Sequence, residues 1–109
     1  MAIKGAVLGD ILGSQYEFNR PKNLDWQNIP LIIDDKAKFT DDSVMMLAIK
    51  KALVEDNDLV ETMVDVDQKY PFCGYGAKFF SWINGKKHQP YNSWGNGFAM
   101  RVAFVGDQL

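Results

Sequence analysis

The sequence is poor in the residues that build disulfides and zinc sites, with one cysteine, Cys73, and one histidine, His88. A single cysteine excludes an intrachain disulfide, and one cysteine with one histidine excludes a structural Cys/His zinc cluster. Basic residues are not in excess either, since 12 Lys and Arg stand against 14 Asp and Glu. The net charge of −2 therefore argues against general nucleic-acid binding.

Long apolar runs are also missing. None approaches the ~20 residues that span a bilayer, and the N-terminal stretch contains the charged residues Lys4 and Asp10. We therefore expect no signal peptide, no membrane partner and a cytoplasmic location. The 109 residues, 47% of them hydrophobic, have the composition of a globular protein and leave room for one domain over residues 1–109.

The hydrophobic pattern predicts a mostly helical protein. A helix is expected over 2–14, a second over 41–54 with Val44, Leu47 and Ala48 on its apolar face, and a third after the N-cap residue Asp58. The other expected elements are an extended connection over 19–38 with room for a strand at Leu31–Ile33, a turn over 70–76, a helix over 78–84, a loop over 88–97, and a last helix over 98–105 stopped by Gly106.

The segment Thr40-Asp41-Asp42-Ser43 stands at the predicted start of the second helix. Thr, Asp and Ser are preferred helix caps, and acidic residues suit the positive end of the helix dipole, so capping alone explains much of the segment. Capping needs only one acceptor, however, whereas two adjacent carboxylates repel each other. The hydroxyls of Thr40 and Ser43 with the carboxylates of Asp41 and Asp42 form an oxygen-only ligand set suited to Mg²⁺ or Mn²⁺.

An acidic residue, Asp10, interrupts the otherwise apolar first helix. Glycines at 5, 9 and 13 recur every four residues and form one stripe on this helix, where another backbone or a ligand can approach closely. Because Asp is rarely buried without a partner, Asp10 is either solvated or paired near that stripe. Glu17 follows the predicted helix and is near enough along the chain to join it.

A third candidate segment is Gly95-Asn96-Gly97, which precedes the last predicted helix. Free N–H groups of such a loop, aimed at a helix N-terminus, bind phosphate or another anion. Arg101 lies one turn into the helix and can pair with a phosphate or with the carboxylates. The alternative is a plain turn in which Asn96 caps the helix.

Together, these motifs resemble those of the ADP-ribosylglycohydrolase family, which includes enzymes similar to dinitrogenase reductase-activating glycohydrolase. The resemblance covers nearly the whole chain and rests on the order and spacing of four segments: Gly5-Ala6-x-x-Gly9-Asp10-x-x-Gly13-x-x-x-Glu17, Phe39-Thr40-Asp41-Asp42-Ser43-x-Met45, Pro71-x-x-Gly74-Tyr75-Gly76 and Pro90-Tyr91-Asn92-Ser93-x-Gly95-Asn96-Gly97-x-Ala99-Met100-Arg101-Val102.

The resemblance implies an all-α fold, a binuclear Mg²⁺ or Mn²⁺ site, and hydrolysis of the glycosidic bond between ADP-ribose and a protein side chain or related acceptor. By motif, Thr40, Asp41 and Asp42 would be metal ligands. Glu17 would match the acid that coordinates metal or contacts the substrate ribose, and would be catalytic together with Asp41 and Asp42. The residues expected to bind or line the ADP-ribose cleft are Asp10, Gly95, Asn96, Gly97 and Arg101.

One part of the family pattern is missing. The second metal-ligand group, of the type Asp-x-Asp-Thr, lies in the C-terminal part of the family's longer domains, and only eight residues follow Arg101 here. Asp65-Val66-Asp67 is followed by Gln68 and precedes the glycine loop, so it does not substitute. We therefore expect a truncated, N-terminal portion of the fold with about half of the metal site.

Three functions remain open from the sequence. The chain is a catalytically impaired relative that acts by binding ADP-ribose or an ADP-ribosylated protein, an active hydrolase whose site another chain completes, or a partner-binding inhibitor of a phage or other mobile element. The surface that missing helices would cover favours a homo-oligomer or a protein partner. A further alternative is that the chain is a fragment of the product of a longer gene.

Overall fold

The computed structural model describes residues 2–17, 25, 27–28, 35–93, 95 and 97–108, and this part of the chain is helical and contains no strand. The predicted strand at Leu31–Ile33 lies outside the described residues. The helices, in chain order, are α1 (Ala2–Ser14), α2 (Asp41–Glu55), α3 (Leu59–Lys69), α4 (Ala77–Asn84), α5 (Gly97–Met100) and α6 (Ala103–Gln108). The all-α prediction is confirmed.

Cap residues fix the starts and ends of the central helices. The Asp58 side chain accepts a hydrogen bond from the Glu61 N–H (2.9 Å), so α3 begins where the sequence predicts. Helix α2 ends at Asp56, which adopts a left-handed conformation (φ 52°) and donates its N–H to the Ala52 carbonyl. The first, second and fourth predicted helices are confirmed to within one residue at each end, and the predicted start of the third helix after Asp58 is confirmed.

The prediction of a single last helix over residues 98–105 is wrong. Residues 98–105 do not form one helix, because α5 and α6 are separated by Arg101 and Val102. Gly106 does not stop a helix either; it lies inside α6, and its N–H donates to the carbonyl of Val102, the residue that precedes α6 (2.9 Å). Helix α5 packs on α2, whereas α6 packs on both α1 and α2. The break therefore coincides with a change in packing, and the hydrophobic pattern of residues 98–105 does not predict it.

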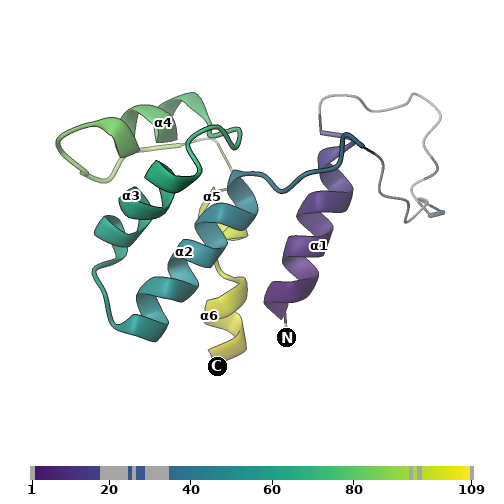
Figure 1. Ribbon diagram of the computed structural model, residues 1–109, viewed down its shortest axis with the longest axis horizontal. Coiled ribbons are helices and arrows are strands. Elements are labelled where there is room, and N and C mark those ends of the chain that lie inside the picture. Colours follow the sequence, from purple (N-terminus) through teal and green to yellow (C-terminus); the bar gives the residue numbers. More distant parts are fainter. Residues whose placement is uncertain are drawn as a thin grey trace.

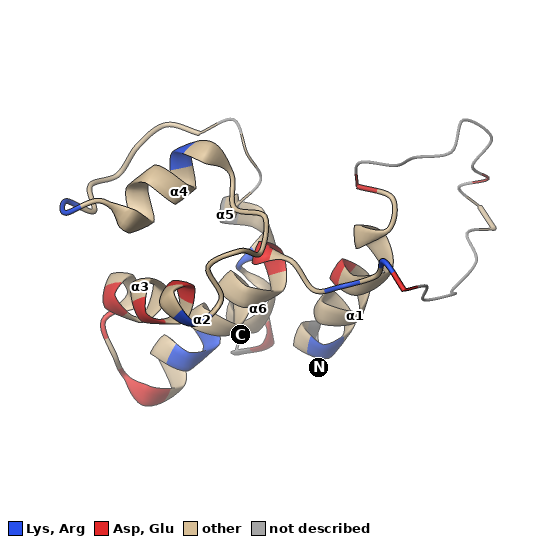
Figure 2. Ribbon diagram, turned by 45° about the horizontal axis from the view of Figure 1, so that its top comes forward, with Lys and Arg blue, Asp and Glu red and all other residues tan. Residues whose placement is uncertain are grey.

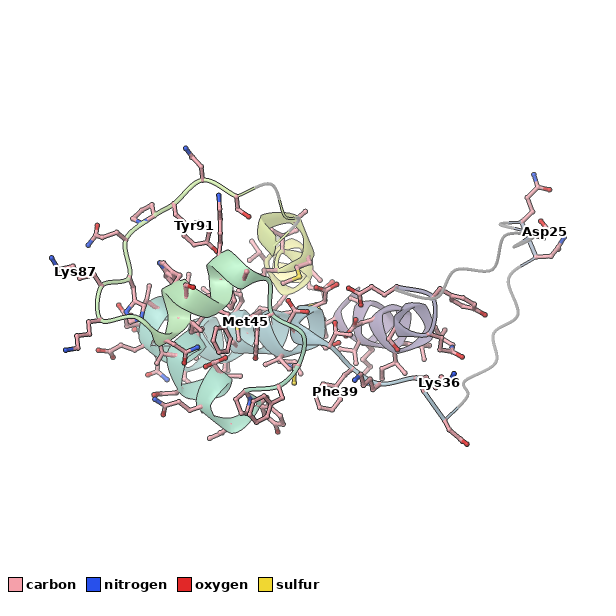
Figure 3. The ribbon with its side chains drawn as sticks, turned by 90° about the horizontal axis from the view of Figure 1, so that it is seen from above. Asp25, Lys36, Phe39, Met45, Lys87 and Tyr91 are labelled. Atoms are coloured by element: carbon pink, nitrogen blue, oxygen red, sulfur yellow. The ribbon has the colours of Figure 1, made fainter. Side chains whose placement is uncertain are left out.

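The core lies around α2, which contacts helices on several sides (Figure 1). Met45 is completely buried, and Figure 3 places it in the interior between α2 and α4. The buried cluster around it is drawn from α2, α3 and α4 and consists of Val44, Met45, Ala48, Ile49, Met63, Phe79 and Ile83. Leu47, expected on the apolar face of α2, is instead 45% exposed.

Helix α1 packs against α2 and α6, and its start lies at the same edge of the molecule as the end of α6 (Figure 1). The glycine stripe of α1 does not receive the close neighbour that the sequence predicts. A Cβ atom built on Gly5, Gly9 or Gly13 would meet nothing within 4 Å. No helix in the described part of the chain is long and apolar enough to cross a membrane.

Candidate functional site

The first turn of α2 is held against α1 by one carboxylate, that of Asp10. Asp10 Oδ2 accepts hydrogen bonds from the Thr40 N–H (2.8 Å) and the Ser43 hydroxyl (2.7 Å), and Oδ1 accepts one from the Thr40 hydroxyl (2.6 Å). Thr40 and Ser43 are both buried. The acid that interrupts the apolar pattern of α1 is therefore paired with the Thr-Asp-Asp-Ser segment.

Helix capping at α2 uses other groups than the two adjacent carboxylates. The Thr40 hydroxyl accepts the Asp42 N–H (3.2 Å), and the Cys73 carbonyl accepts the Asp41 N–H (2.8 Å). Gly74, which follows that carbonyl, has φ +89°, a conformation that side chains rarely adopt. Because a hydroxyl and a loop carbonyl satisfy these N–H groups, the carboxylates of Asp41 and Asp42 are available for another role.

Four acids share one electrostatic environment here, two of them from or just after α1 and two from the start of α2. Burial, reinforced by the negative charges of Asp42, Glu17 and Asp10, raises the pKa of Asp41 to about 6. Burial and the charges of Asp10 and Glu17 also raise the pKa of Asp42, against a lowering effect of Arg101. Figure 2 shows acidic residues on α1 and at the start of α2. The start of α2 is thus a place where an added positive charge would be stabilised.

The donors at this position fit part of a site for a hard divalent cation. Thr40 retains one lone pair after donating to Asp10 and accepting from Asp42, and Asp41 and Asp42 add carboxylate oxygens. Oxygen donors of this kind suit Mg²⁺ or Mn²⁺. Within the described residues, however, no three His, Cys, Asp or Glu side chains are arranged closely enough to hold a metal ion. These oxygens would therefore supply at most some of the ligands of such a site.

Arg101 is the cation that faces this cluster. Its guanidinium carbon lies 4.5 Å from the centre of the Phe79 ring, and its Nε is buried without a hydrogen-bond partner among the described residues. Burial lowers the pKa of Arg101, while the nearby Tyr91, Asp41 and Asp42 act in the opposite direction. A guanidinium stacked on an aromatic ring, with donors left unused, is suited to pairing with a phosphate or carboxylate.

The Gly95-Asn96-Gly97 segment is described only in part, because Asn96 lies outside the described residues. The Gly95 N–H donates to the Ser93 hydroxyl (3.0 Å), so this N–H is already used within the loop. Gly97 begins α5 and lies against Arg101: a Cβ on Gly97 would be 3.1 Å from Arg101 Nη2. The absence of a side chain at 97 therefore leaves room for the guanidinium.

Sequence reasoning missed two features of this region. It assigned Asp10 to ligand binding and did not foresee its hydrogen bonds with Thr40 and Ser43. It also set Asp67 aside, although this residue is buried (4% exposed), its Oδ1 has no partner in the described part of the chain, and burial raises its pKa. The i, i+4 spacing from Met63 to Asp67 places Asp67 on the buried face of α3, and this signal could have found it.

Comparison with known proteins identifies the class. The family described as ADP-ribosylglycohydrolase matches residues 1–109, which is the whole chain. The chain belongs to the ADP-ribosylglycohydrolase family. No solved structure is significantly similar to it.

Proposed function

We propose that this chain binds ADP-ribose together with a divalent cation at the start of α2, and that alone it hydrolyses the glycosidic bond of ADP-ribose only weakly. The observation that carries the proposal is the pair of carboxylates, Asp41 and Asp42, which capping does not use and which the acids of α1 surround with negative charge. Membership of the ADP-ribosylglycohydrolase family supports ADP-ribosylated molecules as ligands.

Residues of this chain have separable roles in the proposal. Thr40, Asp41 and Asp42 would hold the cation, and Glu17, which is exposed just after α1, would reach the cation or the substrate ribose. Arg101, whose guanidinium stacks on the Phe79 ring, would neutralise phosphate charge and orient the ligand. When bound, the cation would polarise ribose hydroxyls and a water molecule.

Weak hydrolysis follows from the number of donors. Mg²⁺ dehydrates reluctantly and needs several carboxylates or phosphates, and two ions need more carboxylates than the described set provides. A second chain that contributes acidic residues would complete the site and give an active hydrolase. Such completion would make hydrolysis depend steeply on protein concentration.

The direct test uses the purified chain with Mn²⁺ and ADP-ribose in isothermal titration calorimetry, and release of ADP-ribose from a mono-ADP-ribosylated protein. Light scattering gives the mass of the chain in each assay. We expect ADP-ribose binding that depends on Mn²⁺, with little release. Rapid release by a monomer would overturn the weak-hydrolysis part, and an absence of binding with Mn²⁺ present would overturn the binding part.

Gly97→Ala tests the role of Arg101 without removing it. The added methyl group would lie 3.1 Å from Arg101 Nη2 and 3.3 Å from Cζ, so the guanidinium must shift by a few tenths of an ångström from its position over Phe79. We expect ADP-ribose affinity to fall by about tenfold, the equivalent of one charge-assisted hydrogen bond, with stability changed by less than about 1 kcal/mol.

The matched control for Gly97→Ala is Gly106→Ala in α6, where a new Cβ would meet nothing within 4 Å. Calorimetry and thermal melts of both variants provide the comparison. Equal ADP-ribose affinity in the two variants would mean that the position of the Arg101 guanidinium does not matter for binding.

A further inference from the structure

We propose, resting on the proposed function, that Asp10 is a positioning residue that fixes the Thr40 hydroxyl so that its remaining lone pair, and not its proton, is available to a cation. The sequence suggested that Asp10 touches the ligand. Its hydrogen bonds instead run to Thr40 and Ser43. The role of Asp10 is therefore indirect and operates through Thr40.

The Thr40 hydroxyl has three hydrogen-bonding positions, and two of them are already used. A hydroxyl has one proton and two lone pairs. The proton of Thr40 points to Asp10 Oδ1 (2.6 Å), and one lone pair accepts the Asp42 N–H (3.2 Å). One lone pair remains, and the hydroxyl cannot rotate its proton into that direction without losing the bond to a carboxylate.

The backbone of Thr40 is fixed by the same carboxylate. Asp10 Oδ2 accepts the Thr40 N–H, so the two oxygens of one side chain hold both the main chain and the side chain of this residue. The contact spans 30 positions in the sequence, joining α1 to the residue that precedes α2. Groups that orient a metal ligand in this way typically change metal affinity by about 10–100-fold when mutated.

Asp10→Asn distinguishes positioning from simple stabilisation. The amide keeps the size of the carboxylate but has only one oxygen, so it cannot accept from both the N–H and the hydroxyl of Thr40 and from Ser43. The Thr40 proton becomes free to turn toward the cation position. We expect Mn²⁺ affinity, measured with Mn²⁺ alone by electron paramagnetic resonance of the free ion, to fall by about 10–100-fold.

Ser14→Ala is the matched control, because Ser14 joins the same two segments without touching Thr40. Its hydroxyl accepts the Lys38 N–H (3.0 Å), two residues before Thr40. This variant is expected to lose stability but to keep wild-type Mn²⁺ affinity. All proteins are measured in the same concentration of an osmolyte such as trimethylamine oxide, which favours the folded state, and folding is verified by circular dichroism.

A double-mutant cycle with Thr40→Val supplies the second readout. If Asp10 acts through Thr40, Asp10→Asn has no further effect on Mn²⁺ affinity in the Thr40→Val background. Full additivity of the two substitutions would overturn the positioning role, as would an Asp10→Asn affinity equal to that of Ser14→Ala. Wild-type protein that binds no Mn²⁺ would overturn this inference and the proposed cation site together, whereas the first two outcomes leave the proposed function standing.

Discussion

Asp41→Asn is expected to weaken Mn²⁺ binding by more than about 100-fold, because the substitution removes a direct carboxylate donor. This loss exceeds the losses of about 10–100-fold that are typical when a residue that only orients a metal ligand is replaced. The change preserves shape, and the capping bond between the residue 41 N–H and the Cys73 carbonyl involves only the backbone. Calorimetry with Mn²⁺ measures the loss. An affinity within about threefold of wild type, a difference of less than 1 kcal/mol, would remove Asp41 from the cation site.

The same variant is expected to be more stable than wild type in the absence of cation at neutral pH. Asp41 has a pKa of about 6 in the folded protein, raised from 3.8 by burial and by neighbouring acids. A raised pKa in the folded state means that the native protein binds more protons, so stability is complete below pH 3.8 and declines as pH rises through about 6. Asparagine does not titrate and escapes this decline.

The expected gain of Asp41→Asn above pH 6 is about 1 kcal/mol, since water screens a partly exposed carboxylate and reduces the effect of the pKa shift. Urea melts of both proteins between pH 4 and 8 measure it, and the difference is expected to vanish toward pH 4. Asp65→Asn, at an exposed position of α3, is the control and is expected to show no such trend. A variant less stable than wild type at pH 8 would contradict the electrostatic account.

Met45→Ala is expected to cause the largest loss of stability, about 2–5 kcal/mol. Met45 is 0% exposed and belongs to the cluster that joins α2 to α3 and α4, so its truncation leaves a cavity lined by apolar side chains. Chains of this size typically have about 5–15 kcal/mol of stability in total, and each kcal/mol shifts the melting temperature by about 4–8 °C. The melting temperature is therefore expected to fall by about 8 °C or more.

Leu53→Ala in the same helix provides the comparison for Met45→Ala. Leu53 is 52% exposed, and its truncation is expected to cost less than about 1 kcal/mol. Urea titrations monitored by circular dichroism measure both variants. Equal losses at positions 45 and 53 would mean that α2 does not bury the face on which Met45 lies.

The helices α1 to α4 could be predicted because their ends carry local signals, such as the Asp58 cap of α3 and Thr40 at α2. The division of the last helix could not, since the break at Arg101 and Val102 coincides with a change in packing partners that the hydrophobic pattern does not indicate. The buried face of α2 was predicted only in part, since Val44 and Ala48 are buried but Leu47 is exposed. This helix is covered from several sides, so burial extends to Met45, Met46, Ile49 and Ala52, and a single apolar stripe does not mark it.

The candidate site was predictable to a similar degree. Adjacent acids at a helix start indicate Asp41 and Asp42, and motif order brings in Glu17 and Arg101. Sequence cannot show that Asp10 faces α2, because that contact depends on the angle at which α1 packs. Nor can it show that Phe79 lies beneath Arg101, since Phe79 belongs to α4 and Arg101 to the connection between α5 and α6, and the two meet only in the folded chain.

The attachment of α1 has a consequence for how the site responds to partial opening. The buried apolar cluster comes from α2, α3 and α4, while α1 is joined to α2 partly through the carboxylate of Asp10. Detachment of α1 would separate Asp10 from Thr40 and move Glu17 away, yet leave that cluster packed. Sub-global opening of this kind requires less free energy than complete unfolding. The affinity of the proposed cation site would therefore be coupled to the docking of α1, and a cation held there would in turn keep that helix in place.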